Sequence, residues 1–115
     1  MFDFEKLIVY QKSREFYVST TQWVEKRPEL SKTIRGQLER ASLSIALNIA
    51  EGTARFTKAD KRNFLVIARG SVFECYAIFD VLEAIDPERR NGLYDYRLSL
   101  EEISKMLFAM IKNLQ

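Results

Sequence analysis

Apolar residues recur along this chain at alternating steps of three and four, which is the spacing of helices buried on one side. The clearest stripe lies near the C-terminus and consists of Leu100, Ile103, Leu107, Met110 and Leu114. Ser99 followed by Glu102 fits a capping box, in which each side chain satisfies a backbone N–H of the first turn. The pattern predicts a helix over about 100–114.

A longer stripe predicts a helix over about 58–86. Thr57 and Asp60 form a second capping box at its start, and Pro87 opposes its continuation. Residues 87–98, which contain Asn91-Gly92, are therefore expected to be the one long loop. The core-facing residues of this helix are predicted to be Phe64, Ala68, Ser71, Cys75, Ile78, Leu82 and Ile85.

Two further helices are predicted upstream, over about 4–25 and 31–52. The buried face of the first is Val9, Ser13, Phe16, Thr20 and Trp23. That of the second is Ile34, Leu38, Ala41, Ile45 and either Asn48 or Ile49, with Gly52 as its C-cap. Its middle, ASLSIALNIA, is apolar nearly all round, which is typical of a helix with neighbours on several sides.

The connections between these helices are short, so sequential helices should pack antiparallel. A chain of 115 residues supports one domain with one core. The sequence therefore predicts an all-α fold, an up-and-down antiparallel four-helix bundle that forms a single domain over residues 1–115.

Composition agrees with this fold, since 47% of the residues are hydrophobic and 30% are charged. The opening MFDFEKLIVYQK lacks the basic start and apolar run of a signal peptide, and no stretch approaches the roughly 20 apolar residues of a membrane span. We therefore expect a cytoplasmic protein. Cys75 is the only cysteine, which excludes an internal disulfide, and is expected to be a small core residue.

The chain contains no histidine, which excludes Ser-His-Asp and Cys-His nucleophiles and the Glu-x-x-His pairs of di-iron bundles. Its four glycines stand far apart, so there is no phosphate-binding glycine loop. We expect no enzyme, no cofactor and no metal site. One catalytic alternative stays open, an all-carboxylate metal site at Glu51 and Glu74.

A stripe of polar residues lies on the otherwise apolar second helix: Arg40, Ser44, Asn48 and Glu51. Such a stripe forms either a polar ligand site or a hydrogen-bonded network that fixes helix register. We favour the network, with Arg69 as a candidate partner.

The outward side of the third helix mixes arginine with bulky apolar residues: Arg62, Val66, Arg69, Phe73 and Tyr76. This is the composition of an interface core. We predict that Val66, Phe73 and Tyr76 form an oligomer interface; the alternative is that one of them packs sideways on a neighbouring helix.

The net charge is only +2, but it is unevenly distributed. Residues 26–69 carry ten Lys or Arg and four acids, a balance of +6, whereas the rest carries eight and twelve, a balance of −4. The densest basic segment is TARFTKADKR, where Phe56 lies among Arg55, Lys58, Lys61 and Arg62. Cations attract phosphate, and an aromatic ring can stack on an unpaired base. This segment, with Arg35 and Arg69 as outlying members, is the predicted nucleic-acid site; the alternative is an ordinary solvated surface.

The second and third helices carry the runs QLERASLSIALNIAEGTAR and FLVIARGSVFE, and the chain opens with DFEKLIVYQKS. These runs resemble the hallmark of the four-helix-bundle family of 23S rRNA intervening-sequence proteins, roughly Q-L-R-R-A-x-x-S-I-x-x-N-I-A-E-G and then F-L-x-I-A-x-G-S. Glu39 departs from it where the family has arginine, and Ala46 where proline is common. The coinciding residues are Gln37, Leu38, Arg40, Ala41, Ser44, Ile45, Asn48, Ile49, Ala50, Glu51, Gly52, Arg55, Phe64, Leu65, Ile67, Ala68, Gly70, Ser71 and Glu74.

This resemblance implies a closed bundle that assembles as a ring, with a pentamer expected. It also implies members that are encoded inside ribosomal RNA genes or act as accessory proteins of diversity-generating retroelements, which bind nucleic acid and a reverse transcriptase. It implies no catalysis. We therefore expect a ring-forming protein that binds RNA or DNA through the basic patch. The alternative is a protein-interaction scaffold or adaptor, for example for a reverse transcriptase, with no direct nucleic-acid role.

Overall fold

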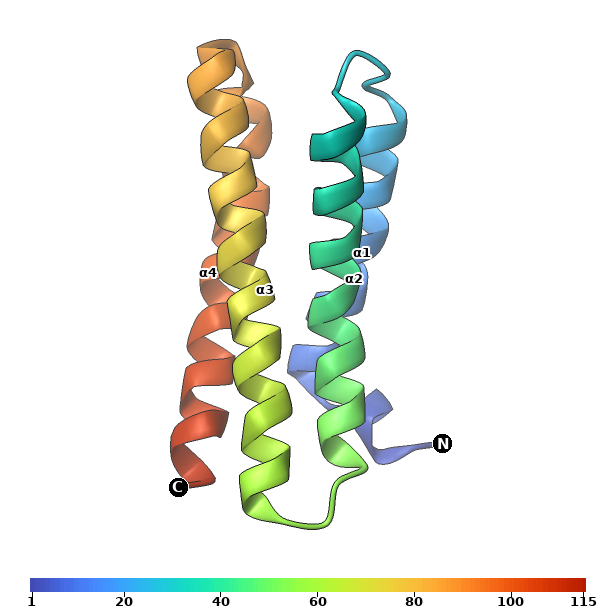
Figure 1. Ribbon diagram of the computed structural model, residues 1–115, viewed down its shortest axis with the longest axis vertical. Coiled ribbons are helices and arrows are strands. Elements are labelled where there is room, and N and C mark those ends of the chain that lie inside the picture. The colour runs from blue at the N-terminus through green and yellow to red at the C-terminus, as the bar shows by residue number, and fades with distance from the viewer.

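Four long antiparallel helices make up the computed structural model, which describes residues 1–115 (Figure 1). They are α1 (Ile8–Glu25), α2 (Lys32–Thr53), α3 (Lys58–Ile85) and α4 (Arg90–Asn113), with short 3₁₀ helices η1 (Asp3–Lys6) and η2 (Pro87–Arg89). Each helix packs against the next one in the chain, and α4 returns to contact α1. The predicted all-α, up-and-down four-helix bundle is confirmed. It measures 44 × 25 × 22 Å.

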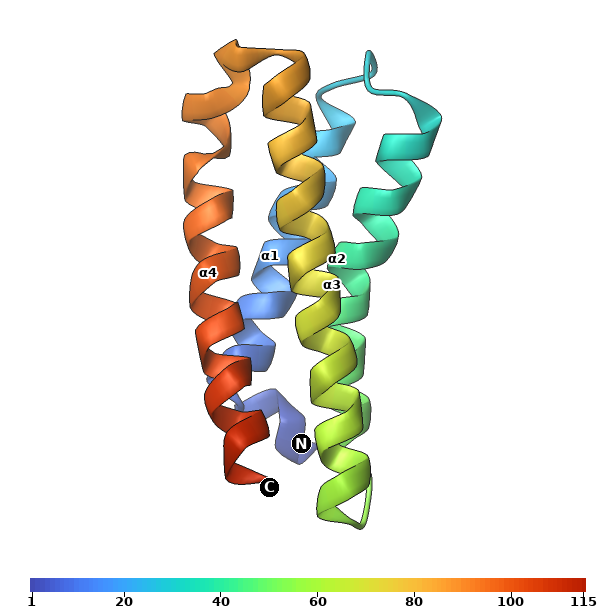
Figure 2. The same cartoon turned by 60° about the vertical axis from the view of Figure 1, so that its left-hand side comes forward.

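The two ends of the bundle differ in what they carry. Figures 1 and 2 both place the α2–α3 turn and the two chain termini at one end, and the α1–α2 and α3–α4 connections at the other. We call the first the turn end; it comprises residues 1–6, 51–62 and 111–115. Antiparallel packing of four helices makes this grouping unavoidable, because the chain reverses direction at each connection.

Side-chain caps mark two of the helix starts. The Ser31 hydroxyl accepts a hydrogen bond from the Ile34 amide at 3.1 Å and starts α2. The Thr57 hydroxyl accepts one from the Asp60 amide at 3.1 Å and starts α3, as the sequence predicts. Each cap satisfies an N–H that has no partner within its own helix.

The predicted loop over 87–98 is wrong. Pro87 occupies the first position of η2, where its missing N–H costs nothing, and α4 begins at Arg90. Leu93 is fully buried, so core packing holds the added turns in spite of Asn91-Gly92. Ser99 consequently lies inside α4 and forms no capping box.

Two other predicted boundaries also change. The first helix does not run unbroken from residue 4, because Leu7 is extended, with φ −74° and ψ 126°, and separates η1 from α1. Gly52 is not a C-cap, since α2 continues to Thr53. Gly52 is buried instead, and a Cβ there would lie 3.2 Å from the Cβ of Phe64, so the missing side chain lets α2 and α3 approach closely.

The buried face of α1 is the predicted one: Val9, Ser13, Phe16, Thr20 and Trp23. On α3 the buried stripe is rotated from the prediction. Phe64, Ser71 and Ile78 are only half-buried and Ile85 is 64% exposed. The rotation arises because α3 must face α4 as well as α2. The stripe that it buries is Leu65, Ala68, Val72, Cys75, Phe79 and Leu82.

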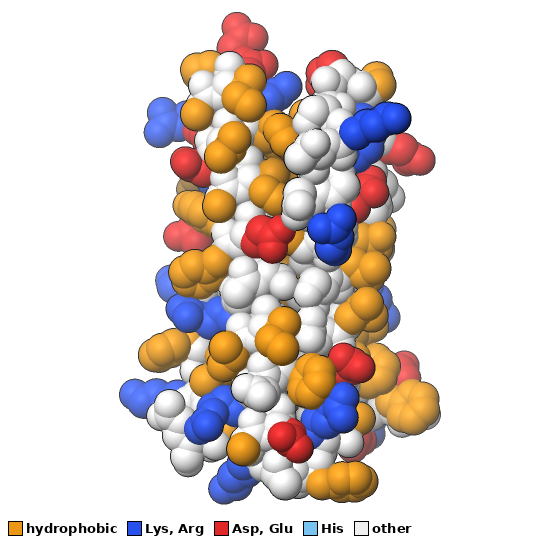
Figure 3. Space-filling view, viewed as in Figure 1, with side chains coloured by type: hydrophobic (Ala, Val, Ile, Leu, Met, Phe, Trp, Pro, Cys, Tyr) orange, Lys and Arg blue, Asp and Glu red, His pale blue; other side chains and the backbone are white.

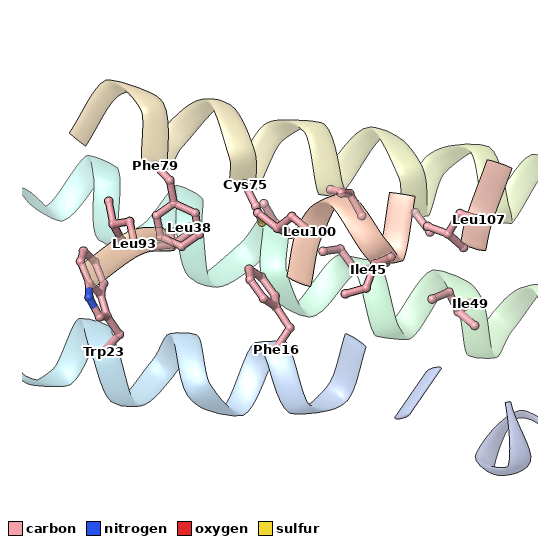
Figure 4. Close-up of a cluster of buried hydrophobic side chains, with 14 of the residues drawn as sticks. Phe16, Trp23, Leu38, Ile45, Ile49, Cys75, Phe79, Leu93, Leu100 and Leu107 are labelled. Carbon is pink, nitrogen blue, oxygen red and sulfur yellow. The ribbon is translucent and has the colours of Figure 1, made fainter. Parts of the chain in front are cut away.

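Aromatic rings fill the half of the core away from the turn end (Figure 4). Phe79 is fully buried, and its ring centre lies 6.3 Å from that of Phe16, 5.9 Å from that of Trp23 and 5.6 Å from that of Tyr96. Tyr96 also donates a hydrogen bond from its hydroxyl to the Ser19 carbonyl at 2.9 Å. This cluster ties α1, α3 and α4 together.

Cys75 is fully buried, and we expect it to resist thiol reagents in the folded protein. Burial, reinforced by the charge of Glu74, raises the pKa of its thiol from the ordinary 9.0 to about 12. The raised pKa leaves far less of the reactive thiolate near neutral pH than a free thiol has. Labelling by a disulfide reagent such as dithionitrobenzoate should be at least about a hundredfold slower than for a free thiol. The same sample in guanidinium should react at the ordinary rate; equal rates in both states would contradict the burial.

Candidate nucleic-acid interface

The turn end carries a fully exposed aromatic ring. Phe56 is 100% exposed in the turn between α2 and α3. Its neighbour Arg55 is fixed in place, because its guanidinium carbon lies 4.4 Å above the centre of the Phe64 ring and its Nη2 lies 3.9 Å from Glu51 Oε1. These two contacts cover one face of the Arg55 guanidinium, and the side chain stays 44% exposed.

Three cations follow in the first turns of α3, and none of them forms an ion pair within the chain. Lys58 is exposed and Arg62 is half-buried. Lys61 turns toward the bundle, where it lines a hollow of about 380 Å³ together with Gly52 and Leu65. Figure 3 shows Lys and Arg side chains next to hydrophobic ones over this lower end of the molecule. Arg55 and Lys58 are therefore exposed cations next to Phe56 in the chain, and the half-buried Arg62 follows one turn after Lys58.

Arg35 does not belong to this site. It lies in the first turn of α2, whereas Arg55 follows the end of that helix, so most of the length of α2, about 27 Å, separates the two. Its guanidinium donates to the Arg27 carbonyl at 2.9 Å and to the Val24 carbonyl at 3.3 Å, so it holds the C-terminus of α1. The basic segment 26–69 is therefore divided between both ends of the bundle and forms no single basic surface, since the length of α2 separates its members.

Arg69 is also separated from the turn end, and it joins the predicted association surface. Its guanidinium carbon lies 4.8 Å from the ring centre of Phe73 and 5.4 Å from that of Phe108 on α4. Phe73 is 56% exposed, Phe108 53% and Val66 50%. A groove of about 550 Å³ continues from Phe73 between α3 and α4, and we call it the α3–α4 groove. It is lined by Val72, Phe73, Tyr76, Ala77, Asp80, Leu100, Glu101, Ser104 and Lys105.

Two arginines border this face, and they differ in their partners. Arg97 lies over the ring of Tyr76, 5.3 Å from its centre, and pairs with Glu83 and, at 3.4 Å, with Asp80. Arg69 stacks in the same way but has no carboxylate in ion-pair range. Its Nε is buried and has no hydrogen-bond partner within the chain, so this guanidinium lacks the partners that Arg97 has. Sequence reasoning missed Phe108, whose contact with Arg69 depends on how α4 packs.

The polar stripe of α2 divides into two parts. Asn48 Nδ2 donates to Ser44 Oγ at 2.9 Å and to the Ser44 carbonyl at 2.8 Å, and Ser71 of α3 donates to Ser44 Oγ at 2.9 Å. These bonds link α2 to α3 at one register. Ser71 is therefore the partner on α3, where we predicted Arg69; Arg69 points toward α4 instead. Arg40 and Glu51 are exposed and take no part in the network.

The carboxylates do not converge into a metal site. No three His, Cys, Asp or Glu side chains gather closely enough to hold an ion, and Glu51 lies beside Arg55. None of the helices combines the length and the apolar character that a membrane crossing requires.

Comparison with known proteins gives two matches and one negative result. Residues 5–109 match the family model described as 23S rRNA-intervening sequence protein. The fold is similar to the 1.70 Å crystal structure of a protein with unknown function from the S23 ribosomal protein family of Bacteroides thetaiotaomicron VPI-5482. That protein is 26% identical, with a TM-score of 0.86, and the match covers 91% of this chain and 99% of that one. No curated protein matches the chain.

Proposed function

The chain belongs to the 23S rRNA-intervening sequence protein family, and from this premise we propose that it is a non-enzymatic protein whose turn end binds the phosphate backbone of RNA or DNA. The observation that carries the proposal is the grouping of Arg55, Lys58 and Arg62 in the α2–α3 turn and the first turns of α3, in the same short segment as the fully exposed Phe56. Their charges are neutralised at most by the weak contact of Arg55 with Glu51. Phosphate contacts of this kind supply most of the affinity in binding that does not depend on sequence.

The chain has no histidine and its one cysteine, Cys75, is buried, so two common catalytic side chains are missing from the surface, which favours a role in binding. The fold itself does not select the function, since helical bundles serve many. The electrostatics of the turn end favour a polyanion.

Replacing Lys58 and Arg62 with glutamine should weaken binding and reduce its salt dependence. Each lost phosphate contact lowers the slope of log affinity against log salt by about 0.7 for a single strand, so the pair should lower it by about 1.4. Fluorescence anisotropy with a labelled RNA and a labelled DNA at several salt concentrations measures both quantities.

The matched control is the Lys26→Gln, Lys32→Gln variant. It removes the same charge from exposed positions at the opposite end of the bundle. Its affinity and salt slope should stay close to those of the wild type. If both double variants behave alike, only net charge matters and the turn end is not the binding site.

The α3–α4 groove supports a second proposal, that the protein self-associates through Val66, Phe73 and Tyr76. Half-exposed aromatic residues around an arginine are typical of interface hot spots. A neighbouring subunit that places a carboxylate against Arg69 would complete the arrangement that Glu83 completes for Arg97. The family resemblance suggests that the product is a ring, with a pentamer expected.

The groove also suits the alternative function, a scaffold or adaptor that docks another protein, such as a reverse transcriptase. In that case the turn end would have no nucleic-acid role. The salt titration separates the two functions, because a scaffold leaves both oligonucleotides unbound at low and moderate salt.

A further inference from the structure

We propose that Phe56 is a base-stacking platform and that the turn end therefore selects an unpaired strand over a duplex. This inference rests on the proposed nucleic-acid function and specifies the class of its ligand.

Phe56 is the most exposed aromatic residue of the chain, and no ring or guanidinium lies on it; Tyr94, at 61% exposed, also lacks such a partner but lies at the opposite end of the bundle. Phe2 is 75% exposed, but its ring stacks on that of Phe4 with 6.0 Å between centres. Phe73 and Phe108 are covered on one side by Arg69. Phe56 is 100% exposed, so both faces of its ring are open to a planar group.

The backbone on either side of Phe56 is held by hydrogen bonds. The Ala54 amide donates to the Glu51 carbonyl at 3.1 Å, and the Arg55 amide donates to the Gly52 carbonyl at 3.3 Å. On the other side, the Lys61 amide donates to the Thr57 carbonyl at 3.0 Å. The turn is therefore positioned before a ligand arrives, which reduces the ordering cost of binding.

The charges nearest to the ring fit a nucleotide. Arg55 precedes it, and Lys58 follows two residues later at the start of α3. A base that stacks on Phe56 places its own phosphates within reach of these flanking cations. A base in a duplex is already stacked on both faces and offers none to the ring, whereas every base of an unpaired strand has an open π-face.

A lipid surface is the competing ligand for an aromatic ring among cations. The acidic side chains at the same end oppose it, because a flat anionic surface approaches them together: Asp3, Glu5, Glu51 and Asp60. A strand can follow the cations and avoid the acids. The observations therefore favour an unpaired strand, and binding to lipid vesicles is measured as the competing outcome.

Replacing Phe56 with alanine tests the platform directly. Removal of an aromatic ring on which a base stacks lowers the affinity by about 5- to 150-fold. We expect this loss for oligo(dT) and oligo(rU) of about 16 nucleotides, with no change in the salt slope because no charge is removed. Affinity for a hairpin-free duplex of equal length should change by less than about twofold. Because the ring touches nothing, the variant should keep the wild-type unfolding midpoint.

Phe56→Trp supplies a second readout. The one native tryptophan, Trp23, is 7% exposed and lies in the half of the bundle away from the turn end, so its emission provides a constant background. Stacking on a base should quench the added indole emission upon strand binding. Insertion into phosphatidylserine–phosphatidylcholine vesicles would shift it to shorter wavelength.

The outcomes separate this inference from the function beneath it. Quenching by single strands, together with the loss in Phe56→Ala, supports the platform. Equal binding of strand and duplex without quenching overturns it, while the loss in Lys58→Gln, Arg62→Gln would still uphold the proposed function. A vesicle-induced shift without quenching by strands also overturns it. Absence of any binding to wild-type protein overturns both.

Discussion

Phe79→Ala should lower the free energy of unfolding by about 3–5 kcal/mol, the largest effect that we expect from one core substitution. Phe79 is fully buried at the centre of the aromatic cluster, where its ring meets Phe16, Trp23 and Tyr96. Truncation removes the apolar surface and leaves a cavity that three helices cannot easily fill. Urea denaturation followed by circular dichroism measures the loss, and the thermal midpoint should fall by about 10 °C or more.

The matched control is Phe56→Ala, which makes the same chemical change at a fully exposed ring. Its effect on unfolding should stay within about 0.5 kcal/mol. The comparison isolates burial from side-chain type. Similar losses in the two variants would mean that Phe79 does not occupy the packed core.

Phe73→Lys should convert an assembled protein into single chains of 13.5 kDa. Phe73 borders the α3–α4 groove and supports Arg69, so lysine removes the apolar contact and places a second positive charge one turn from the first. An unpaired charge in an interface core costs several kcal/mol, enough to dissociate a complex of ordinary affinity. Light scattering on the purified protein at several concentrations measures the mass.

Val81→Lys is the control for this prediction. Val81 lies on the same helix and is 51% exposed, similar to Phe73, but it does not line the groove. It should leave the mass unchanged. A wild-type protein that is already a single chain, or a Phe73→Lys protein that stays assembled, would remove the groove as the interface.

Together these substitutions separate three properties of one small bundle. We expect Phe79 to act on folding, and we propose that Phe73 acts on assembly and the cations of the turn end on ligand binding. Their sites do not overlap in space, so each effect should be measurable in a protein that keeps the other two.

The sequence by itself determined that the chain forms four long α-helices, because the 3.6-residue period is a local property of the chain. It identified the buried face of α1 from Val9 to Trp23 and the Thr57 cap of α3. It also placed four cations and Phe56 in one short segment, where proximity in the chain keeps them at one end of the bundle.

Tertiary packing decided what depends on angle and distance. The predicted buried stripe of α3 runs through Phe64 and the observed one through Leu65. Both contain Ala68, Cys75 and Leu82, so the sequence alone does not distinguish them, and the positions of α2 and α4 decide that the Leu65 stripe is buried. Likewise α4 begins before Leu93 because this side chain is buried in the core of the bundle. Arg35 and Arg69 looked like members of one basic patch, but charge counts along a chain ignore the length of a helix. The fold places Arg35 on the carbonyls of Arg27 and Val24, and Arg69 between two phenylalanines of different helices.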